Sequence, residues 1–449
     1  MVRLHRQGPR ALSLLQGRQP RPDAGAAAMI ALDLARLADE VDAQLAELAT
    51  FSAAPAPAVE RVLYTKTDLE GRAYVRSLAE RAGLKTRVDP IGNTFFRLEG
   101  ADRDAPAIAT GSHVDAIPNA GRFDGTVGVI GGIAALRAIR EASIVPARSL
   151  EVIAFTSEEP TRFGLGCIGS RLMSGAITPD LVRALRDAEG RAFEDVRRDA
   201  GFEGALEQVR LPEGRYAAFV ELHVEQGPVL EAERIPIGVV TAIAAPASYA
   251  LEVRGVGGHA GAVLMPARRD AMTAAAEIVL AVEHAAKSTK SADTVGTVGV
   301  VRVHPGAINS IPSRVHLEID LRDTDLASRR DAFAMIEDAI ARVQRERGVE
   351  IVLRTINEDP PAISAPAILD TIEASSRALD LRTRRMPSRA YHDALFMARI
   401  APTAMIFVPS VAGVSHRPDE LTHPEDVARG VAVLAGTMLR LAAAEVLHG

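Results

Sequence analysis

Apolar strand-like segments and amphipathic helix-like segments alternate along most of this 449-residue chain, and this alternation limits the possible folds more than any other feature. Helical periodicity marks residues 31–50, 68–82 and 127–139, whereas strand-like runs mark residues 86–98, 107–110, 149–156 and 217–222. Such alternation predicts an α/β fold with a mostly parallel sheet that helices cover on both faces. Ligands bind at the carboxyl ends of the strands in such sheets, so residues that follow strands are the first candidates for a functional site.

The alternation is interrupted between about residues 246 and 357. Strand-like runs at 249–253, 294–303, 313–320 and 349–353, with helical stretches at 266–286 and 326–344, give the order β-α-β-β-α-β of the ferredoxin-like unit. The first pattern then resumes, with helices at 367–378, 394–398 and 425–441 and a strand at 403–408. We therefore expect a large domain formed by residues 30–245 and 358–449, and a smaller α+β domain, residues 246–357, inserted in it.

The N-terminal stretch differs in composition from the rest of the chain. Its first 28 residues are rich in arginine, contain no acid before Asp23 and lack a clean apolar or amphipathic pattern. We interpret residues 1–29 as a disordered tail or the product of an upstream start, with Met29 as a natural start. A targeting presequence stays open as the alternative.

Composition excludes several classes of protein. The net charge of −6 argues against a nucleic-acid-binding surface and against binding to an anionic membrane. No apolar run is long enough to cross a bilayer, so no transmembrane helix is expected. The single cysteine, Cys167, rules out an internal disulfide and suits a reducing compartment. We therefore expect a cytoplasmic protein in which Cys167 is a buried, inert thiol.

Residues that can bind metals follow several of the predicted strands. Each has an ordinary alternative: an aspartate can cap the next helix, a glutamate pair is usually solvated, and a histidine in an apolar strand is usually a core residue. Five such positions at strand ends make these alternatives untenable together: His113, Asp124, Glu159, His223 and His416. Imidazole and carboxylate ligands suit divalent metals, and five of them fit two ions with one bridging carboxylate. Glu158, beside Glu159, stays free to act as a general base.

Four longer stretches resemble a known family. They are residues 155–164 (FTSEEPTRFG), 258–266 (GHAGAVLMP), 304–312 (HPGAINSIP) and 388–399 (SRAYHDALFMAR). On these motifs the chain, from about residue 32 to its end, resembles the dinuclear-metal amidohydrolases, which include aminoacylases, N-carbamoyl-L-amino-acid hydrolases, β-ureidopropionases and allantoate amidohydrolases. The resemblance implies two divalent ions per subunit, with manganese favoured and zinc or nickel possible. It also implies a homodimer formed through the inserted domain, which would act as a lid.

The same resemblance assigns roles to the residues at the strand ends. The metal ligands would form two sets that share one bridging carboxylate: His113, Asp124 and His223, and Asp124, Glu159 and His416. Glu158 would be the general base, and Asp115 would orient His113 from the second shell of the metal.

Further roles concern the substrate. His259, in the inserted domain, would stabilise the oxyanion and would reach in from a neighbouring subunit. Asn309 and Arg322 would bind a substrate carboxylate, which matches a planar guanidinium. A surface arginine at a strand end is an equally good interpretation of Arg322 from sequence alone. Gln226 and His392 would line the pocket.

Two departures from the carbamoylase pattern point to one branch of the family. Carbamoylases commonly have Thr-Thr-Pro where this chain has residues 262–264 (AVL), and glycine where it has Tyr391, whose ring narrows the pocket and adds a hydroxyl. Both features resemble the branch that hydrolyses ureidoglycolate, a small ureido compound with a carboxylate. This implies attack of a metal-activated water on the ureido carbonyl to give glyoxylate, ammonia and carbon dioxide. Hydrolysis of N-carbamoyl-L-amino acids or allantoate is the alternative, and a non-catalytic metal-binding module is a remote one.

Overall fold

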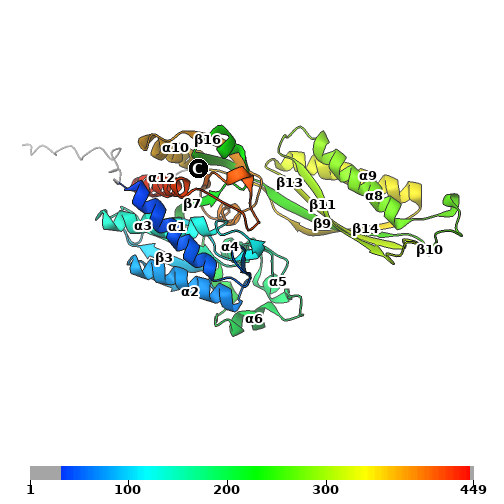
Figure 1. Cartoon of the computed structure of the whole chain (residues 1–449), viewed down its shortest axis with the longest axis horizontal. Helices are drawn as coiled ribbons and strands as arrows, with labels where there is room; N and C mark the ends of the chain where they lie inside the picture. The colour runs from blue at the N-terminus through cyan, green and yellow to red at the C-terminus, as the bar shows by residue number, and fades with distance from the viewer. Residues whose placement is uncertain (1–31, 445–449) are drawn as a thin grey trace, which may run out of the picture.

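The structure, a computed structural model, describes residues 32–444 and forms two lobes (Figure 1). The large lobe is built around a nine-stranded sheet, and the small lobe, residues 245–358, projects from it to the right in the figure. Our interpretation of residues 1–29 concerns a stretch that lies outside the described residues. None of the helices in the described part of the chain is long and apolar enough to cross a membrane.

The large sheet has the strand order β15-β8-β17-β7-β4-β6-β3-β2, and β16 pairs with β8 beside this path. Its strands are β2 (Lys85–Val88), β3 (Thr94–Leu98), β4 (Ala107–His113), β6 (Leu150–Phe155), β7 (Tyr216–Val224), β8 (Ile237–Ile243), β15 (Ala362–Ile363), β16 (Thr383–Ser388) and β17 (Thr403–Val408). The four central strands β17, β7, β4 and β6 are parallel to one another, so their carboxyl ends meet at one edge.

The prediction of a mostly parallel sheet is wrong, because the sheet is mixed. Four of its pairings are parallel and four are antiparallel. One antiparallel pairing arises where residues 86–98 form a hairpin, β2–β3, rather than one strand. The Asp89 carboxylate accepts backbone N–H groups of Ile91 and Asn93 there and closes a tight turn. Such a turn lets neighbouring strands pair without a crossover helix.

Helices cover both faces of this sheet. One face carries α1 (Leu34–Thr50), α2 (Lys66–Arg81), α3 (Thr126–Glu141), α10 (Pro366–Ala378) and α12 (Pro424–Ala443), which share one apolar core with the strands. The other face carries shorter helices around a second core: α4 (Ile168–Ser174), α5 (Pro179–Ala184), α6 (Phe193–Asp199), α7 (Val229–Glu233) and α11 (Asp393–Met397), with the 3-10 turn η1 (Leu206–Val209). A two-stranded ribbon, β1 (Val59–Arg61) and β5 (Ala116–Ala120), lies beside the end of β4.

Helix α3 approaches the sheet closely because it carries three glycines. A Cβ atom on Gly128 would lie 2.4 Å from the Leu222 carbonyl oxygen on β7, a distance that no real side chain tolerates. The glycine run 125–131 therefore serves close helix–strand packing. This packing holds the start of α3, and the turn before it, directly above the ends of β4 and β7.

The small lobe has its own core and sheet. Its main elements are β9 (Ala245–Arg254), α8 (Ala271–Ser288), β11 (Val295–His304), β13 (Arg314–Asp323), α9 (Leu326–Arg347) and β14 (Glu350–Glu358). The sheet is antiparallel with the order β11-β13-β9-β14, and α8 and α9 pack on one of its faces. This is the β-α-β-β-α-β arrangement. A small ribbon of β10 (Gly258–His259) and β12 (Ser310–Ile311), with η2 (Met265–Ala267), forms its far end (Figure 1).

Buried arginines hold the two lobes together where the chain crosses between them. Arg171 of α4 donates to both carboxylate oxygens of Asp359, at 3.0 and 2.6 Å. Arg329 of α9 donates to the backbone carbonyls of Ala245 and Asp359, at 2.9 and 2.6 Å. Both crossings are therefore tied by charged hydrogen bonds away from solvent.

Candidate active site

The central parallel strands bring most of the expected site residues to one edge of the large sheet. His113 is the last residue of β4, and Glu158 and Glu159 follow β6. His223 is the second-last residue of β7, and His416 lies on the loop after β17, beyond η3 (Val411–Gly413). Side chains that are far apart in the sequence therefore converge because the four strands share one direction.

The first cluster consists of His113, Asp124 and His223, whose candidate ligand atoms all lie within 4.8 Å of one another. The Nε2 atom of His223 lies 3.1 Å from Oδ1 of Asp124, and that of His113 lies 3.8 Å from the same oxygen. Each ring places Nδ1 2.9 Å from a backbone carbonyl, of Asp115 for His113 and of Val224 for His223. Because a carbonyl only accepts, Nδ1 carries the proton and Nε2 is the atom available to a metal.

The second cluster consists of Asp124, Glu159 and His416 and meets the same 4.8 Å limit. Nε2 of His416 lies 3.0 Å from Oδ2 of Asp124 and 3.5 Å from Oε1 of Glu159. The two oxygens of Asp124 thus face different histidines, one in each cluster. This donor set of imidazoles and carboxylates, with one shared carboxylate, fits a pair of neighbouring divalent ions.

A third group of potential ligands, Glu221, His223 and His392, shares His223 with the first. Its carboxylate is already engaged: Oε1 of Glu221 accepts from the Ser112 hydroxyl at 2.7 Å, and Oε2 accepts from the Ala394 N–H at 2.9 Å. Glu221 therefore supports the strand ends rather than forming a separate metal site.

The turn that carries Asp124 is held by two residues. Gly125 has φ +66°, and a Cβ there would lie 2.3 Å from Nε2 of His113, so only glycine fits beside the imidazole. Glu420 accepts the N–H groups of Phe123 and Asp124 at 2.8 and 3.0 Å, although it lies almost three hundred residues away. Its other oxygen accepts from the Ser415 hydroxyl at 2.9 Å, next to His416. Sequence reasoning missed Glu420, and no local pattern marks it.

Asp115 has a different contact from the one we expected. It is the backbone carbonyl of Asp115, not its carboxylate, that lies in hydrogen-bonding distance of His113, whose Nδ1 is 3.8 Å from the nearest carboxylate oxygen. The carboxylate instead accepts the N–H groups of Glu158 and Glu159, at 3.3 and 3.0 Å. It thereby fixes the turn after β6, in which Ser157 has a left-handed φ of +60°.

Electrostatics make this cluster receptive to cations. Burial, reinforced by Glu159, raises the pKa of Glu158 well above its usual value, and burial followed by the Asp124 charge raises the pKa of Glu159 to about 8. The hydrogen bond from His416 to Asp124 raises the imidazole pKa to about 9. Burial opposes charge on His223, but the hydrogen bond to Asp124 and the charges of Asp124 and Glu221 together outweigh burial and raise the His223 pKa to about 9. Divalent ions would compensate these buried carboxylates and displace the imidazole protons.

Both clusters line a cavity of about 540 Å³. It is lined by His113, Ile117, Asp124, Glu158, Glu159, Pro160, His223, Gln226, Arg322, Ala390, Tyr391, His392, Ser415 and His416. The structure thus brings the expected metal ligands and Glu158 together with four expected substrate contacts: Gln226, Arg322, Tyr391 and His392. Ser415 is a further lining residue, and its position next to His416 was the signal that could have identified it.

Three of the substrate-contact candidates differ in the hydrogen-bonding groups that they leave available. Gln226 donates to Asp124 at 3.0 Å and to Ser415 at 3.2 Å, and its buried Oε1 has no partner in the described structure. Arg322 donates through Nε and Nη2 to Asp320, at 2.7 and 2.9 Å, so Nη1 stays available. Burial, with the neighbouring His223, lowers the pKa of His392 well below its usual value, so this ring is neutral.

His259 and Asn309 are not part of this cavity. Both are exposed, His259 on β10 and Asn309 just before β12, at the far end of the small lobe (Figure 1). The backbone carbonyl of Asn309 accepts the Ala260 N–H at 2.9 Å, so the two segments are tied to each other. Neither residue is among those that line the cavity of its own chain.

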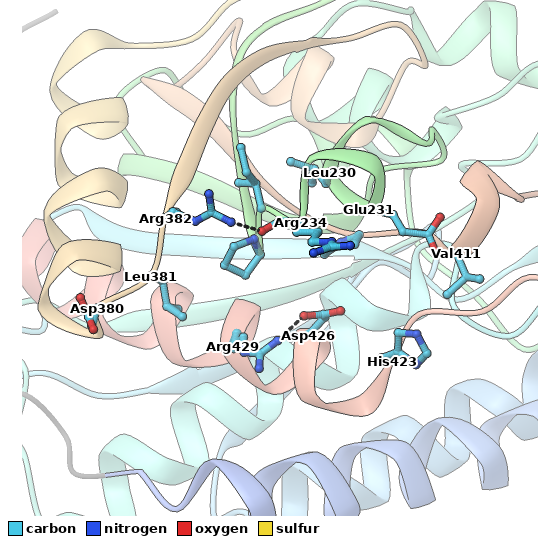
Figure 2. A pocket seen from close by; sticks show the side chains of 13 residues that line it. Leu230, Glu231, Arg234, Asp380, Leu381, Arg382, Val411, His423, Asp426 and Arg429 are labelled. Carbon is cyan, nitrogen blue, oxygen red and sulfur yellow. Dashed lines mark hydrogen bonds and ion pairs between the residues drawn. The ribbon is translucent and has the colours of Figure 1, made fainter.

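Another hollow, of about 440 Å³, is lined in part by residues of α7, of α12 and of the segment after β17 (Figure 2). Two of its arginines are already engaged: Arg429 pairs with Asp426 at 2.5 Å, and Arg382 donates to the Arg234 carbonyl at 2.5 Å. It contains none of the metal-ligating clusters found in the described chain. The cavity above the strand ends is therefore the candidate active site.

Comparison with known proteins agrees with this geometry. Residues 109–440 match Peptidase family M20/M25/M40, which is metal-dependent. The chain belongs to this family. Ureidoglycolate hydrolase of Oryza sativa subsp. japonica is 50% identical over 410 residues, which cover 90% of this chain and 84% of that protein. The resemblance seen in the sequence motifs is thereby confirmed.

Two further relatives show similarity along most of the chain. The crystal structure of AtUAH in complex with glyoxylate matches with a TM-score of 0.83 at 48% identity, covering 91% of this chain and 100% of that chain. An N-carbamoyl-L-amino acid amidohydrolase of Geobacillus stearothermophilus is 38% identical over 403 residues, which cover 90% of this chain and 98% of that protein.

Proposed function

We propose that this chain is an amidohydrolase that converts ureidoglycolate to glyoxylate, ammonia and carbon dioxide. The observation that carries the proposal is the 50% identity with the ureidoglycolate hydrolase of Oryza sativa, against 38% with the carbamoylase, across nearly the same span of the chain. The cavity supports it chemically, because metal-ligating clusters, a buried carboxylate and an arginine line one space of about 540 Å³. On the evidence of its single cysteine we assign the enzyme to the cytoplasm.

We assign two divalent ions to the clusters that share Asp124, with manganese favoured and zinc or nickel also suited to these ligands. Bound there, such ions supply Lewis acidity toward the ureido carbonyl and make water a stronger acid. Asp115 contributes by fixing the turn that carries Glu158 and Glu159. Glu420 contributes by holding the N–H groups of the Asp124 turn.

Glu158 takes the proton from the attacking water in this proposal. It is buried, lines the cavity and belongs to neither of the metal-ligating clusters that share Asp124. Its Oε2 lies 3.7 Å from Nε2 of His113, so the free carboxylate faces the first cluster. A carboxylate in that position can move the proton from the water to the departing amine.

Arg322 binds the substrate carboxylate through Nη1, since Nε and Nη2 are engaged by Asp320. Gln226 offers its unpaired Oε1 to a ureido N–H group. His392, held by Ser388 at 2.9 Å, and Tyr391 close the remaining wall of the cavity.

The small lobe acts as a lid and dimerisation domain in this proposal, and His259 and Asn309 of the partner subunit complete the cavity. Their exposure at the end of the lobe, away from their own cavity, supports this role. The test mixes two inactive variants, His259→Ala and Glu158→Gln. Hybrid dimers hold one intact site, so mixing should restore activity, whereas no recovery despite measured subunit exchange would refute the shared site.

The substrate assignment is tested by ammonia release from ureidoglycolate, N-carbamoyl-L-amino acids and allantoate, with protein reconstituted with Mn²⁺. We expect the highest kcat/KM with ureidoglycolate. A preference for a carbamoyl amino acid or allantoate would assign the chain to another branch of the family. Absence of metal-dependent ammonia release from any of them would indicate a non-catalytic metal-binding protein.

A further inference from the structure

Cys167 lies directly behind Glu158, although its sequence context predicted an inert core residue. It is the chain's one cysteine and is completely buried. It begins helix α4 with a left-handed φ of +55°, a conformation that side chains other than glycine rarely adopt. Such a backbone persists only where its surroundings hold it, so its contacts indicate what the strained position achieves.

The backbone of Cys167 and of the two residues after it is hydrogen-bonded to the turn that carries Glu158. The Cys167 N–H donates to the Glu158 carbonyl at 2.9 Å, and the next two N–H groups donate to Ser157 and Thr156, at 2.9 and 2.8 Å. Residues 167–169 therefore run along residues 156–158, locked to them by three backbone hydrogen bonds. This frame fixes the Cys167 backbone beside Glu158, and the thiol lies within reach of two carboxylates, those of Glu158 and Asp393.

The thiol lies 3.6 Å from Oε1 of Glu158, within hydrogen-bonding distance for sulfur. No other hydrogen-bond donor to this carboxylate occurs among residues 32–444. The opposite oxygen, Oε2, faces Nε2 of His113 at 3.7 Å, on the cavity side. One oxygen of Glu158 is thus held from behind while the other points toward the reacting centre.

Burial and the neighbouring Glu158 raise the pKa of the Cys167 thiol well above its usual range. The group therefore keeps its proton and acts as a hydrogen-bond donor, not as a nucleophile or a metal ligand. Cys167 does not line the active-site cavity and does not belong to a metal-ligating cluster.

We infer that Cys167 is a positioning residue, whose S–H group donates to Oε1 of Glu158 and holds Oε2 in the orientation needed for proton transfer. The inference rests on the proposed role of Glu158 as general base. The S–H group is a weak donor, and losing its hydrogen bond to the Glu158 carboxylate changes the equilibrium between orientations of that carboxylate about threefold to tenfold. The effect should fall on kcat, because the thiol touches neither the substrate nor the metal-ligating side chains.

The test compares Cys167→Ala, which removes the donor, with Cys167→Ser, which keeps one, in the Mn²⁺-reconstituted enzyme acting on ureidoglycolate. We expect Cys167→Ala to lower kcat threefold to tenfold, with KM and bound metal unchanged, and Cys167→Ser to recover to within about twofold of the wild type. In a Glu158→Gln background Cys167→Ala should cause no further loss, because the base is already absent. The matched control is Ser174→Ala, which removes a buried hydroxyl at the other end of α4.

Three results would overturn the inference. They are a wild-type kcat in Cys167→Ala, an equal loss in Cys167→Ala and Cys167→Ser, and a loss in the Glu158→Gln background as large as in the wild type. Failure of the proposed function looks different: Glu158→Gln would then retain normal turnover, or the wild type would release no ammonia.

A measurement without substrate keeps the inference testable even if the cysteine variants do not fold. Because the chain has one cysteine, its infrared S–H stretching band reports this thiol alone. Replacing the acceptor by Glu158→Ala should shift the band to higher frequency, as expected when a hydrogen bond is lost. An unchanged band would show that the thiol does not donate to Glu158.

Discussion

The sequence departs from the carbamoylase pattern at Tyr391, so replacing this residue is the most discriminating experiment. The ring lines the cavity and packs partly on the core of the large lobe. The Arg322 guanidinium lies 5.6 Å from the ring centroid. The phenolic hydroxyl has no hydrogen-bond partner in the described chain. It is therefore free for a substrate hydroxyl.

This geometry gives different expectations for two variants. Tyr391→Phe removes no hydrogen bond within the protein, so the free energy of unfolding should change by less than about 0.5 kcal/mol. Any loss of kcat/KM for ureidoglycolate then reports a bond to substrate, worth about 0.5–1.5 kcal/mol or twofold to tenfold. Tyr391→Gly also removes the cation–π contact with Arg322, worth about 0.5–1 kcal/mol. It should cost more turnover with ureidoglycolate and admit the bulkier allantoate.

The assay is kcat/KM for ureidoglycolate and allantoate in the wild type and both variants. Tyr74→Phe is the control, because Tyr74 lies outside the cavity and should leave both values unchanged. If Tyr391→Gly loses ureidoglycolate turnover and gains none with allantoate, Tyr391 is a packing residue and the specificity argument is refuted. If Tyr391→Phe equals the wild type, the hydroxyl does not bind the substrate.

Three further measurements test other parts of the site. Glu158→Gln should retain both metals, measured by elemental analysis, but lose at least about a hundredfold in kcat; near-normal turnover with metals bound would exclude it as the base. Because His223 and His416 have pKa values of about 9 before metals bind, Mn²⁺ must displace their protons. The affinity of the protein for Mn²⁺ should therefore rise from pH 6 to pH 9, and an equal affinity at pH 6 and pH 8 would contradict this. Asp359→Ala leaves the buried Arg171 charge without its carboxylate partner and should lower the free energy of unfolding by about 3–5 kcal/mol. Urea denaturation measures this free energy of unfolding, and a decrease of less than about 1 kcal/mol would mean that the ion pair does not stabilise the junction between the lobes.

Local sequence pattern was sufficient to identify which residues follow the strands. The runs at 107–110, 149–156, 217–222 and 403–408 all became strands of the central sheet. The residues at their ends, from His113 to His416, do line one cavity. This worked because apolar runs report burial and turn residues report strand ends, and both signals are local.

Strand direction was harder to predict, and the expected mostly parallel sheet is mixed. Whether two strands pair in parallel depends on how the connection between them runs through space. A tight turn such as the one at Asp89 reverses the chain without leaving a strong pattern. The helix expected at 266–286 also begins later, at Ala271, because Asp270 caps it by accepting the N–H groups of Met272 and Thr273.

Composition and spacing alone thus identified an α/β protein with acids and histidines just after the carboxyl ends of its strands. The contacts that tune those groups depend on packing between distant segments. The Asp115 carboxylate holds the Glu158–Glu159 turn, and Glu420 holds Asp124 across almost three hundred residues. Cys167 faces Glu158 only because residues 167–169 fold back along the end of β6. A single sequence shows which side chains are present. Which atom each side chain faces is decided by tertiary contacts, and these can join residues at any separation along the chain.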